Sequence, residues 1–117
     1  MKGERLLCAV PGGIYGEILE EVSRTMYDNK HETVGNLPID IAQADLSQIL
    51  TGYCKRKASL VVVGDEGSEL SVRIRQLDKR LPIVAYTSEP VSWADIVVYC
   101  NETDISNLIE VITALEH

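Results

Sequence analysis

Two pairs of polar residues are the side chains in this sequence best suited to chemistry. Asp65 and Glu66 follow the apolar run that ends at residue 63, and Thr87 and Ser88 follow the run that ends at residue 86. An acidic pair at the end of a buried strand can hold a divalent cation, with the hydroxyls at the same rim. The simpler interpretation is that the acidic loop serves solvation and that the hydroxyls suit the turn before Pro90.

A glycine-rich segment with Gly12, Gly13 and Gly16 separates the first apolar run from the first helical pattern. No Ser, Thr, Asp or Asn caps the expected helix, which leaves its first backbone N–H groups available to an anion such as phosphate. The spacing is similar to the dinucleotide fingerprint G-x-G-x-x-G, but Pro11 stands where the first glycine belongs. The simpler interpretation is a tight turn, with Gly16 allowing the helix to pack closely on the sheet.

A cysteine in the first apolar run, Cys8, offers a third interpretation. Its place resembles that in the B-type domains of sugar phosphotransferase systems, where a cysteine ending the first strand carries phosphate ahead of a helix. In this sequence Ala9, Val10 and Pro11 separate the thiol from the helix. The arrangement predicts a buried thiol, whereas a reactive thiolate needs an exposed, electropositive setting.

Metal and disulfide chemistry have little support in the sequence. The three cysteines, Cys8, Cys54 and Cys100, form an odd set without C-x-x-C spacing, which disfavours both a disulfide framework and a zinc site. The two histidines, His31 and His117, are too scattered to build a metal site by themselves. We therefore expect reduced thiols, no metal and no cofactor.

The overall charge argues against a nucleic-acid partner. The 117 residues include 11 basic and 18 acidic side chains, and the resulting net charge of -7 repels a phosphate backbone. The basic clusters at 55–57 and 79–80 lie at expected helix ends, where positive charge complements the helix dipole. No apolar run approaches the roughly 20 residues of a membrane helix, and the amino terminus has no cleavable signal pattern. These features predict a cytoplasmic protein without a membrane or nucleic-acid partner.

Short apolar runs predict the strands that position the candidate residues. Strands of a parallel sheet that is covered on both faces lose the alternation of polar and apolar residues. Four runs have this pattern, and they cover residues 6–10, 60–63, 83–86 and 96–100. A weaker candidate at 32–37 suits an edge strand, with its length limited by Gly35 and Pro38.

Apolar residues at helical spacing predict four helices between and after these strands, at 14–26, 42–53, 70–77 and 105–112. Asp40, with Gln43 three residues later, has the spacing of a capping box for the second helix. Thr103 or Asp104 is the expected cap of the last.

The order of elements predicts an α/β fold, a three-layer α/β/α sandwich around a five-stranded parallel sheet. Right-handed crossovers favour the flavodoxin-like strand order 2-1-3-4-5, in which ligands bind at the carboxyl ends of strands one and three. Residues 11–13, 64–66 and 87–88 are predicted to meet there. We expect one domain over residues 1–114, with residues 115–117 as the remnant of a cloning tag.

Three sequence stretches carry a resemblance to a known family: SLVVVGD at 59–65, LPIVAYT at 81–87 and ADIVVYC at 94–100. With the closing helix, they make most of the chain resemble response-regulator receiver domains, the phospho-acceptor modules of two-component signalling. In that family an acidic pair after the first strand holds magnesium, an aspartate ending the third strand accepts the phosphoryl group, and a lysine ends the fifth. The resemblance implies that Asp65, or less well Glu66, is the acceptor and that Thr87 is the hydroxyl ending the fourth strand.

The sequence departs from the family at two of these positions. Val10, Pro11 and Gly12 stand where the acidic pair belongs, and Cys100 and Asn101 stand where the lysine belongs. Phosphoryl transfer to a carboxylate needs a metal and a cation to neutralise the charge on the phosphoryl oxygens. The segment between the fourth and fifth strands is also shorter than is usual in the family. The resemblance therefore implies a degenerate receiver in which normal phosphorylation is not expected.

The leading functional hypothesis is a non-catalytic signalling or regulatory domain that acts by contact with a protein partner or with a second copy of itself. Trp93 and Tyr99 are the candidate interface residues, expected on the face made by the fifth strand and the last helix, since aromatic residues anchor interfaces. Core packing is the simpler interpretation for both. Two alternatives stay open: a binder of a small phosphate-bearing ligand that uses the glycine segment, and a cysteine phosphocarrier.

Overall fold

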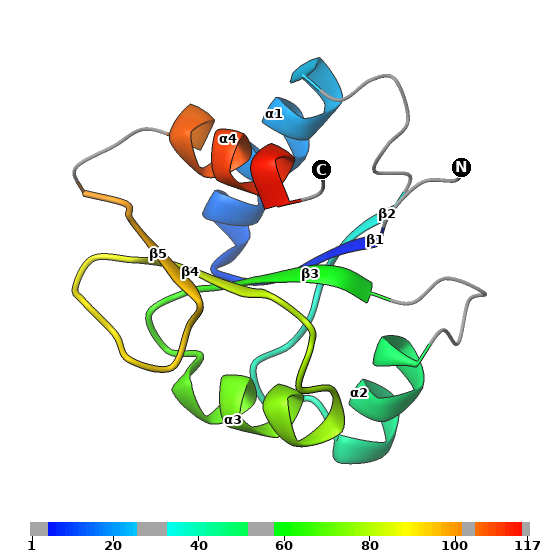
Figure 1. Ribbon diagram of the computed structural model, residues 1–117. Helices are drawn as coiled ribbons and strands as arrows, with labels where there is room; N and C mark the ends of the chain where they lie inside the picture. Colours follow the sequence, from blue (N-terminus) through cyan, green and yellow to red (C-terminus); the bar gives the residue numbers. More distant parts are fainter. Residues whose placement is uncertain (1–4, 26–32, 52–57, 102–104, 116–117) are drawn as a thin grey trace.

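The computed structural model describes residues 5–25, 33–51, 58–101 and 105–115 of the chain. Five parallel strands form one sheet in the order β2-β1-β3-β4-β5 (Figure 1). The predicted fold class and strand order are confirmed. The strands are β1 (Arg5–Ala9), β2 (Thr33–Asn36), β3 (Ala58–Val63), β4 (Ile83–Thr87) and β5 (Ile96–Tyr99), and the helices are α1 (Gly12–Thr25), α2 (Gln43–Leu50), α3 (Ser68–Leu77) and α4 (Ile105–Leu115).

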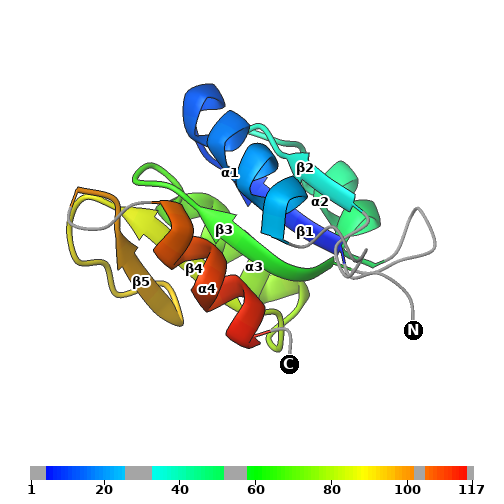
Figure 2. The same ribbon diagram turned by 90° about the horizontal axis from the view of Figure 1, so that it is seen from above.

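Helices cover both faces of the sheet. The pair α1 and α4 lies on one face and the pair α2 and α3 on the other (Figure 1), and the view from above shows α1 and α4 next to each other across the strands (Figure 2). No helix in the described parts of the chain is both long and apolar enough to cross a membrane.

The two faces hold separate hydrophobic cores, because successive strand residues point to opposite sides of a sheet. In β1, Leu6 and Cys8 pack in the core under α1 and α4, whereas Leu7 and Ala9 pack in the core over α2 and α3. The strand β3 divides in the same way, and all five residues of β4 are buried. Burial on both faces explains why these strands show no polar alternation in the sequence.

A side-chain clamp fixes the end of β1, where the candidate site begins. The Asn36 amide donates from Nδ2 to the carbonyl oxygen of Val10 at 3.0 Å, and its Oδ1 accepts the Val10 N–H at 3.1 Å. The Leu37 N–H also donates to the carbonyl of Cys8 at 2.7 Å. These bonds continue the pairing of β1 with β2 as far as Val10. They therefore fix the backbone that leads into the first turn of α1.

The predicted capping box of α2 is wrong. The helix is preceded by Ala42 in an extended conformation, and no side chain caps it. The Gln43 side chain instead accepts a hydrogen bond at Oε1 from Nε of Arg73 at 2.9 Å, and Arg73 also donates to the carbonyl of Ile41 at 2.6 Å. The Gln43 side chain, which the sequence spacing assigned to the capping box, therefore joins α2 to α3 instead. The cap predicted for α4, at Thr103 or Asp104, lies outside the described residues.

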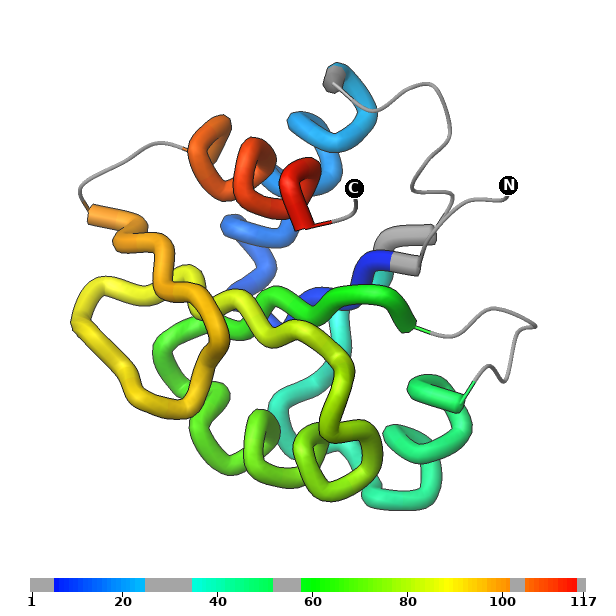
Figure 3. The backbone as a smooth tube through the Cα atoms, viewed as in Figure 1, coloured from blue at the N-terminus to red at the C-terminus, as the bar shows by residue number. Residues whose placement is uncertain are grey.

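The connection between β4 and β5 carries no helix, as the short segment in the sequence predicts. Parallel neighbours are usually joined by a crossover of a dozen or more residues, but here residues 88–95 run from one strand to the next as an open loop (Figure 3). On the face of the sheet that α2 and α3 cover, Trp93 and Ala94 of this loop pack on the core instead of a helix. A hollow remains beside them.

Candidate functional site

A small cleft lies at the carboxyl ends of β1, β3 and β5, where the sequence predicted a site. Its volume is about 180 Å³. Pro11 and Ile14 from the first turn of α1 form one wall, and Gly64, Asp65 and Glu66 after β3 form another. The remaining lining comes from Ala9, Ile39, Tyr86 and Cys100. The winding of the sheet reverses between β1 and β3, so this cleft occupies the switch point of a doubly wound fold.

Asp65 is exposed at this edge and is bound by the segment that follows β4. Its Oδ1 accepts the backbone N–H of Ser88 at 2.9 Å. The Ser88 hydroxyl lies 3.4 Å from Oδ1 and 3.3 Å from Oδ2 of the same carboxylate. The structure thus brings together two of the residues predicted at the rim, and Ser88, not Thr87, is the hydroxyl residue that contacts the carboxylate.

The Thr87 hydroxyl is bonded within its own turn. It is fully buried and donates from Oγ1 to the carbonyl of Glu89 at 2.8 Å, within its own turn. This bond is the local side-chain to backbone pairing that threonine makes in turns. The simpler interpretation of Thr87, a turn residue before Pro90, is the one that the geometry supports.

The glycine segment lies outside the cleft. Gly12 and Gly13 are the first two residues of α1, they are exposed, and they do not line the cleft. A Cβ atom added at either glycine, or at Gly16, would have no atom within 4 Å. Close packing of Gly16 on the sheet is therefore wrong, because Gly16 lies on the solvent side of α1.

The cleft is also poorly matched to a dinucleotide or another phosphate-bearing ligand. Ligand sites usually enclose about 300–1,000 Å³, and this cleft has about 180 Å³. Two carboxylates, Asp65 and Glu66, line it and would repel a phosphate. The lining favours water or a small uncharged group over a nucleotide.

The residues that directly follow β1 and β5 carry no charge. Val10 is buried and Pro11 is exposed at the end of β1, and the half-buried Cys100 follows β5 and lines the cleft beside Asp65. Across the described ranges, no group of three His, Cys, Asp or Glu side chains is placed to hold a metal ion. Asp65 thus has a hydroxyl and a backbone N–H as its recorded partners, and neither neutralises a charge as a cation does.

The thiol of Cys8 is removed from the cleft. Cys8 is fully buried in the core under α1 and α4, and burial raises its pKa from 9.0 to about 12. A thiolate is the reactive form of cysteine, so this environment suppresses nucleophilic chemistry. The position is that of a packed core residue, as the sequence predicted.

Trp93 lies on a different face from the one that the sequence suggested. It packs on the core over α2 and α3, on the opposite side of the sheet from α4. Tyr99 is half-buried in the edge strand β5, and alternation with Val98, which packs under α4, directs it to the same side as Trp93. The expected face made by β5 and α4 is therefore wrong for Trp93, and strand alternation directs Tyr99 away from it as well.

A hollow that no sequence pattern indicated lies between α3 and the loop that joins β4 to β5. Arg75 from α3 and Asp95 from the loop form an ion pair there, with Nη2 and Oδ2 2.7 Å apart. Oδ2 of Asp95 also accepts the N–H of Ile83 at 2.8 Å. Arg75 and Asp95 are twenty positions apart in the sequence, so no local spacing predicts that they pair.

Comparisons with known proteins support the architecture and leave the family open. No protein-family model and no curated protein matches this sequence. Among solved structures, the fold is similar to that in "Crystal structure analysis of HP1043", which describes an orphan response regulator of H. pylori, with a TM-score of 0.67 and 16% identity over 100% of both chains. At that identity the likeness concerns the fold alone. The chain therefore has a receiver-like, flavodoxin-like fold, with five parallel strands in the order 2-1-3-4-5 and helices on both faces.

Proposed function

We propose that this protein is a regulatory interaction domain that signals through contacts with protein surfaces and not through phosphoryl transfer. The observation that carries this proposal is the surroundings of Asp65, the counterpart of the phospho-acceptor. Its carboxylate is bonded to Ser88, while Val10 and Pro11 occupy the place of the metal-binding pair. Charge on a transferring phosphoryl group needs cations or a metal within the site, and these positions provide neither.

Phosphorylation chemistry offers a direct test. After incubation with acetyl phosphate and Mg²⁺, we expect the intact mass of the protein to stay unchanged, because the carboxylate of Asp65 has no metal-binding pair beside it. A receiver domain with the complete acidic pair and lysine, treated in parallel, is the positive control. The proposal fails if the protein gains a phosphoryl group that is absent from Asp65→Asn treated in the same way.

The edge strand β5 supports self-association as the contact that this domain makes. β5 pairs with β4 alone, so its outer backbone groups form an open sheet edge in the described structure. Val97 and Tyr99 are half-buried on this strand. Open edges with apolar side chains favour pairing with another chain, and aromatic residues anchor such interfaces.

Sedimentation equilibrium tests self-association. We expect the weight-average mass to rise from monomer towards dimer with protein concentration, and Val97→Lys to return it to the monomer value, because a lysine on an edge strand opposes pairing. The matched control is Leu19→Lys, the same type of change at an exposed apolar residue of α1, which should leave the mass unchanged. A wild-type protein that stays monomeric at all concentrations, or an equal effect of both variants, would exclude β5 as the interface.

A further inference from the structure

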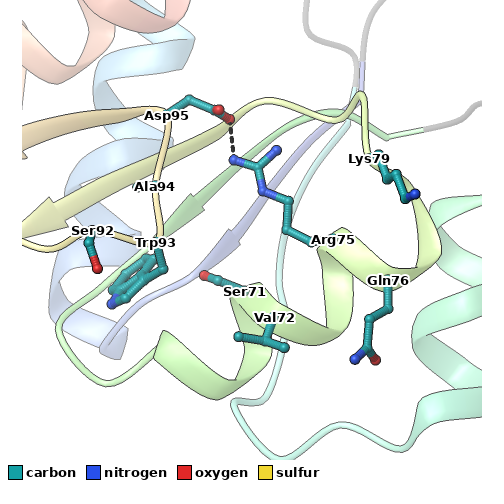
Figure 4. Close-up of a pocket in the computed structure, with 9 residues that line it drawn as sticks. All are labelled: Ser71, Val72, Arg75, Gln76, Lys79, Ser92, Trp93, Ala94 and Asp95. Atoms are coloured by element: carbon teal, nitrogen blue, oxygen red, sulfur yellow. Dashed lines mark ion pairs between the residues drawn. The ribbon is translucent and has the colours of Figure 1, made fainter.

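The hollow beside α3 has the dimensions of a small-molecule site. It is an open depression of about 600 Å³ between one side of α3 and residues 92–95 of the loop before β5 (Figure 4). This volume falls within the roughly 300–1,000 Å³ of typical ligand sites. It is also more than three times that of the cleft at Asp65, which is about 180 Å³.

A buried hydroxyl without a partner lies in the wall of this hollow. Ser71 is 0% exposed, and its Oγ has no hydrogen-bond partner in the described structure. Buried polar atoms are nearly always hydrogen bonded in folded proteins, and each exception calls for an explanation. The Ser71 side chain points across the hollow towards Trp93 (Figure 4). A ligand group that reached this atom would provide the missing partner.

Positive side chains rise from the same side of α3 as that hydroxyl. Arg75 lies one helical turn after Ser71, a spacing that puts both side chains on the same side of α3. Arg75 uses Nη2 for its ion pair with Asp95, and its other N–H donors have no partner among the described residues. Lys79 also lines the hollow. The lining of the hollow thus has two positive side chains, Arg75 and Lys79, and one negative side chain, Asp95. Its formal charge is positive, although the net charge of the chain is -7.

The other walls are apolar and aromatic. Trp93 lies across from Ser71 and is half-buried (Figure 4). Val72 lines the hollow and is 51% exposed, the most exposed of the large hydrophobic residues in the described structure. A flat ring between these side chains would bury apolar surface and make an aromatic contact with the indole.

We propose that this hollow binds a small aromatic carboxylate, with its ring between Trp93 and Val72 and its carboxylate accepting hydrogen bonds from Ser71 and Arg75. A planar carboxylate matches the fork of donors on a guanidinium, and it also accepts from a hydroxyl. The site lies on the α3 side of the sheet and is separate from the cleft at Asp65. It goes beyond the proposed interaction function, because it gives the domain a small-molecule ligand.

The single tryptophan makes the site directly observable. Trp93 is the only tryptophan in the chain, so its indole N–H gives one unambiguous resonance in a ¹H–¹⁵N spectrum. The probe is 1-naphthaleneacetate, and the controls are the neutral 1-naphthaleneacetamide and acetate, which lacks a ring. We expect a saturable shift of the indole resonance with naphthaleneacetate, roughly tenfold weaker binding of the amide because a charged hydrogen bond is lost, and no shift with acetate.

Two variants with matched controls locate the carboxylate. Ser71→Ala and Arg75→Gln should each weaken naphthaleneacetate binding roughly tenfold, since each removes a donor to a charged group. Ser68→Ala on the same helix and Arg80→Gln, both at exposed positions outside the hollow, should bind as the wild type does. Circular dichroism should show no loss of thermal stability in Ser71→Ala, because the hydroxyl has no partner to lose.

Three results would overturn the proposal. The first is the absence of a saturable shift of the indole resonance with naphthaleneacetate. The second is equal affinity for the acid and the amide. The third is unchanged affinity in a folded Ser71→Ala.

Discussion

Replacing Gly67 with alanine is expected to lower the free energy of unfolding by about 3 kcal/mol, the upper range for overpacking a core. A Cβ atom at this position would overlap Cγ1 of Val63 and would lie 3.2 Å from its Cβ and 3.4 Å from the carbonyl oxygen of Gly64. Val63 is fully buried in β3, so its methyl group cannot turn away without meeting other core atoms. Urea denaturation followed by circular dichroism measures the change.

Two further variants separate overpacking from a general effect of removing a glycine. Gly16→Ala should stabilise the protein by about 1 kcal/mol, because an exposed helix interior prefers alanine and a Cβ there meets no atom within 4 Å. In a Val63→Ala background, the cost of Gly67→Ala should fall, since the overlapping methyl group is gone. Equal costs of Gly67→Ala in the wild-type and Val63→Ala backgrounds would show that Val63 is not the obstacle.

Gly67 also closes the turn that carries the candidate site residues Asp65 and Glu66. It donates its N–H to the carbonyl of Gly64 at 3.2 Å, which closes the turn that carries Asp65 and Glu66. Its own carbonyl accepts the N–H of Ser71 at 2.8 Å in the first turn of α3. A shift at Gly67 is therefore expected to disturb the bond between Asp65 and Ser88 as well as the fold.

Alkaline pH is expected to destabilise the wild-type protein by about 4 kcal/mol more than it destabilises Cys8→Ala by pH 12. Burial raises the pKa of the Cys8 thiol from 9.0 to about 12. Below pH 9 the thiol is protonated in both folded and unfolded chains, so its contribution to stability is fully present. Between pH 9 and pH 12 the unfolded chain releases the proton and the folded chain retains it, so stability falls as the pH rises.

Denaturation by urea in steps from pH 8 upwards tests this dependence. The free energy of unfolding of wild type should fall faster than that of Cys8→Ala, by about 1.4 kcal/mol for each pH unit above 9. Burial, and secondarily the charge of Cys8, also raise the pKa of Tyr15, so part of the alkaline loss should remain in the variant. Parallel curves for the two proteins would contradict the buried thiol, as would rapid labelling of Cys8 by iodoacetamide in the folded protein.

The amino-acid pattern was sufficient for the elements and for their order. Runs such as 60–63 and 83–86 are continuous because helices cover both faces, and this signal is local in the sequence. The order 2-1-3-4-5 followed from the handedness of crossovers, which is a general property of L-amino acid chains. The meeting of Asp65 with Ser88 followed in turn, since both lie at the carboxyl ends of strands in one sheet.

Several details of the site could not be predicted from the sequence. A polar side chain often has more than one acceptable hydrogen-bond partner, and the fold decides which of them lies within bonding distance. Thr87 bonds to Glu89 in its own turn, and Ser88 contacts Asp65 instead. Gln43 bonds to Arg73 across two helices instead of capping its own. In each case two partners were chemically acceptable, and the distance in three dimensions decided between them.

What the sequence by itself determined is a parallel α/β sheet with uncharged residues directly after the first and fifth strands. Only the tertiary structure decided that Trp93 faces α3, that Arg75 pairs with Asp95, and that the Ser71 hydroxyl stands unpaired in a hollow. The physical reason is that hydrophobic periodicity is recorded over a few neighbouring residues, whereas a hollow is formed by segments distant in the chain. Its walls come together only when the loop at 88–95 closes beside α3.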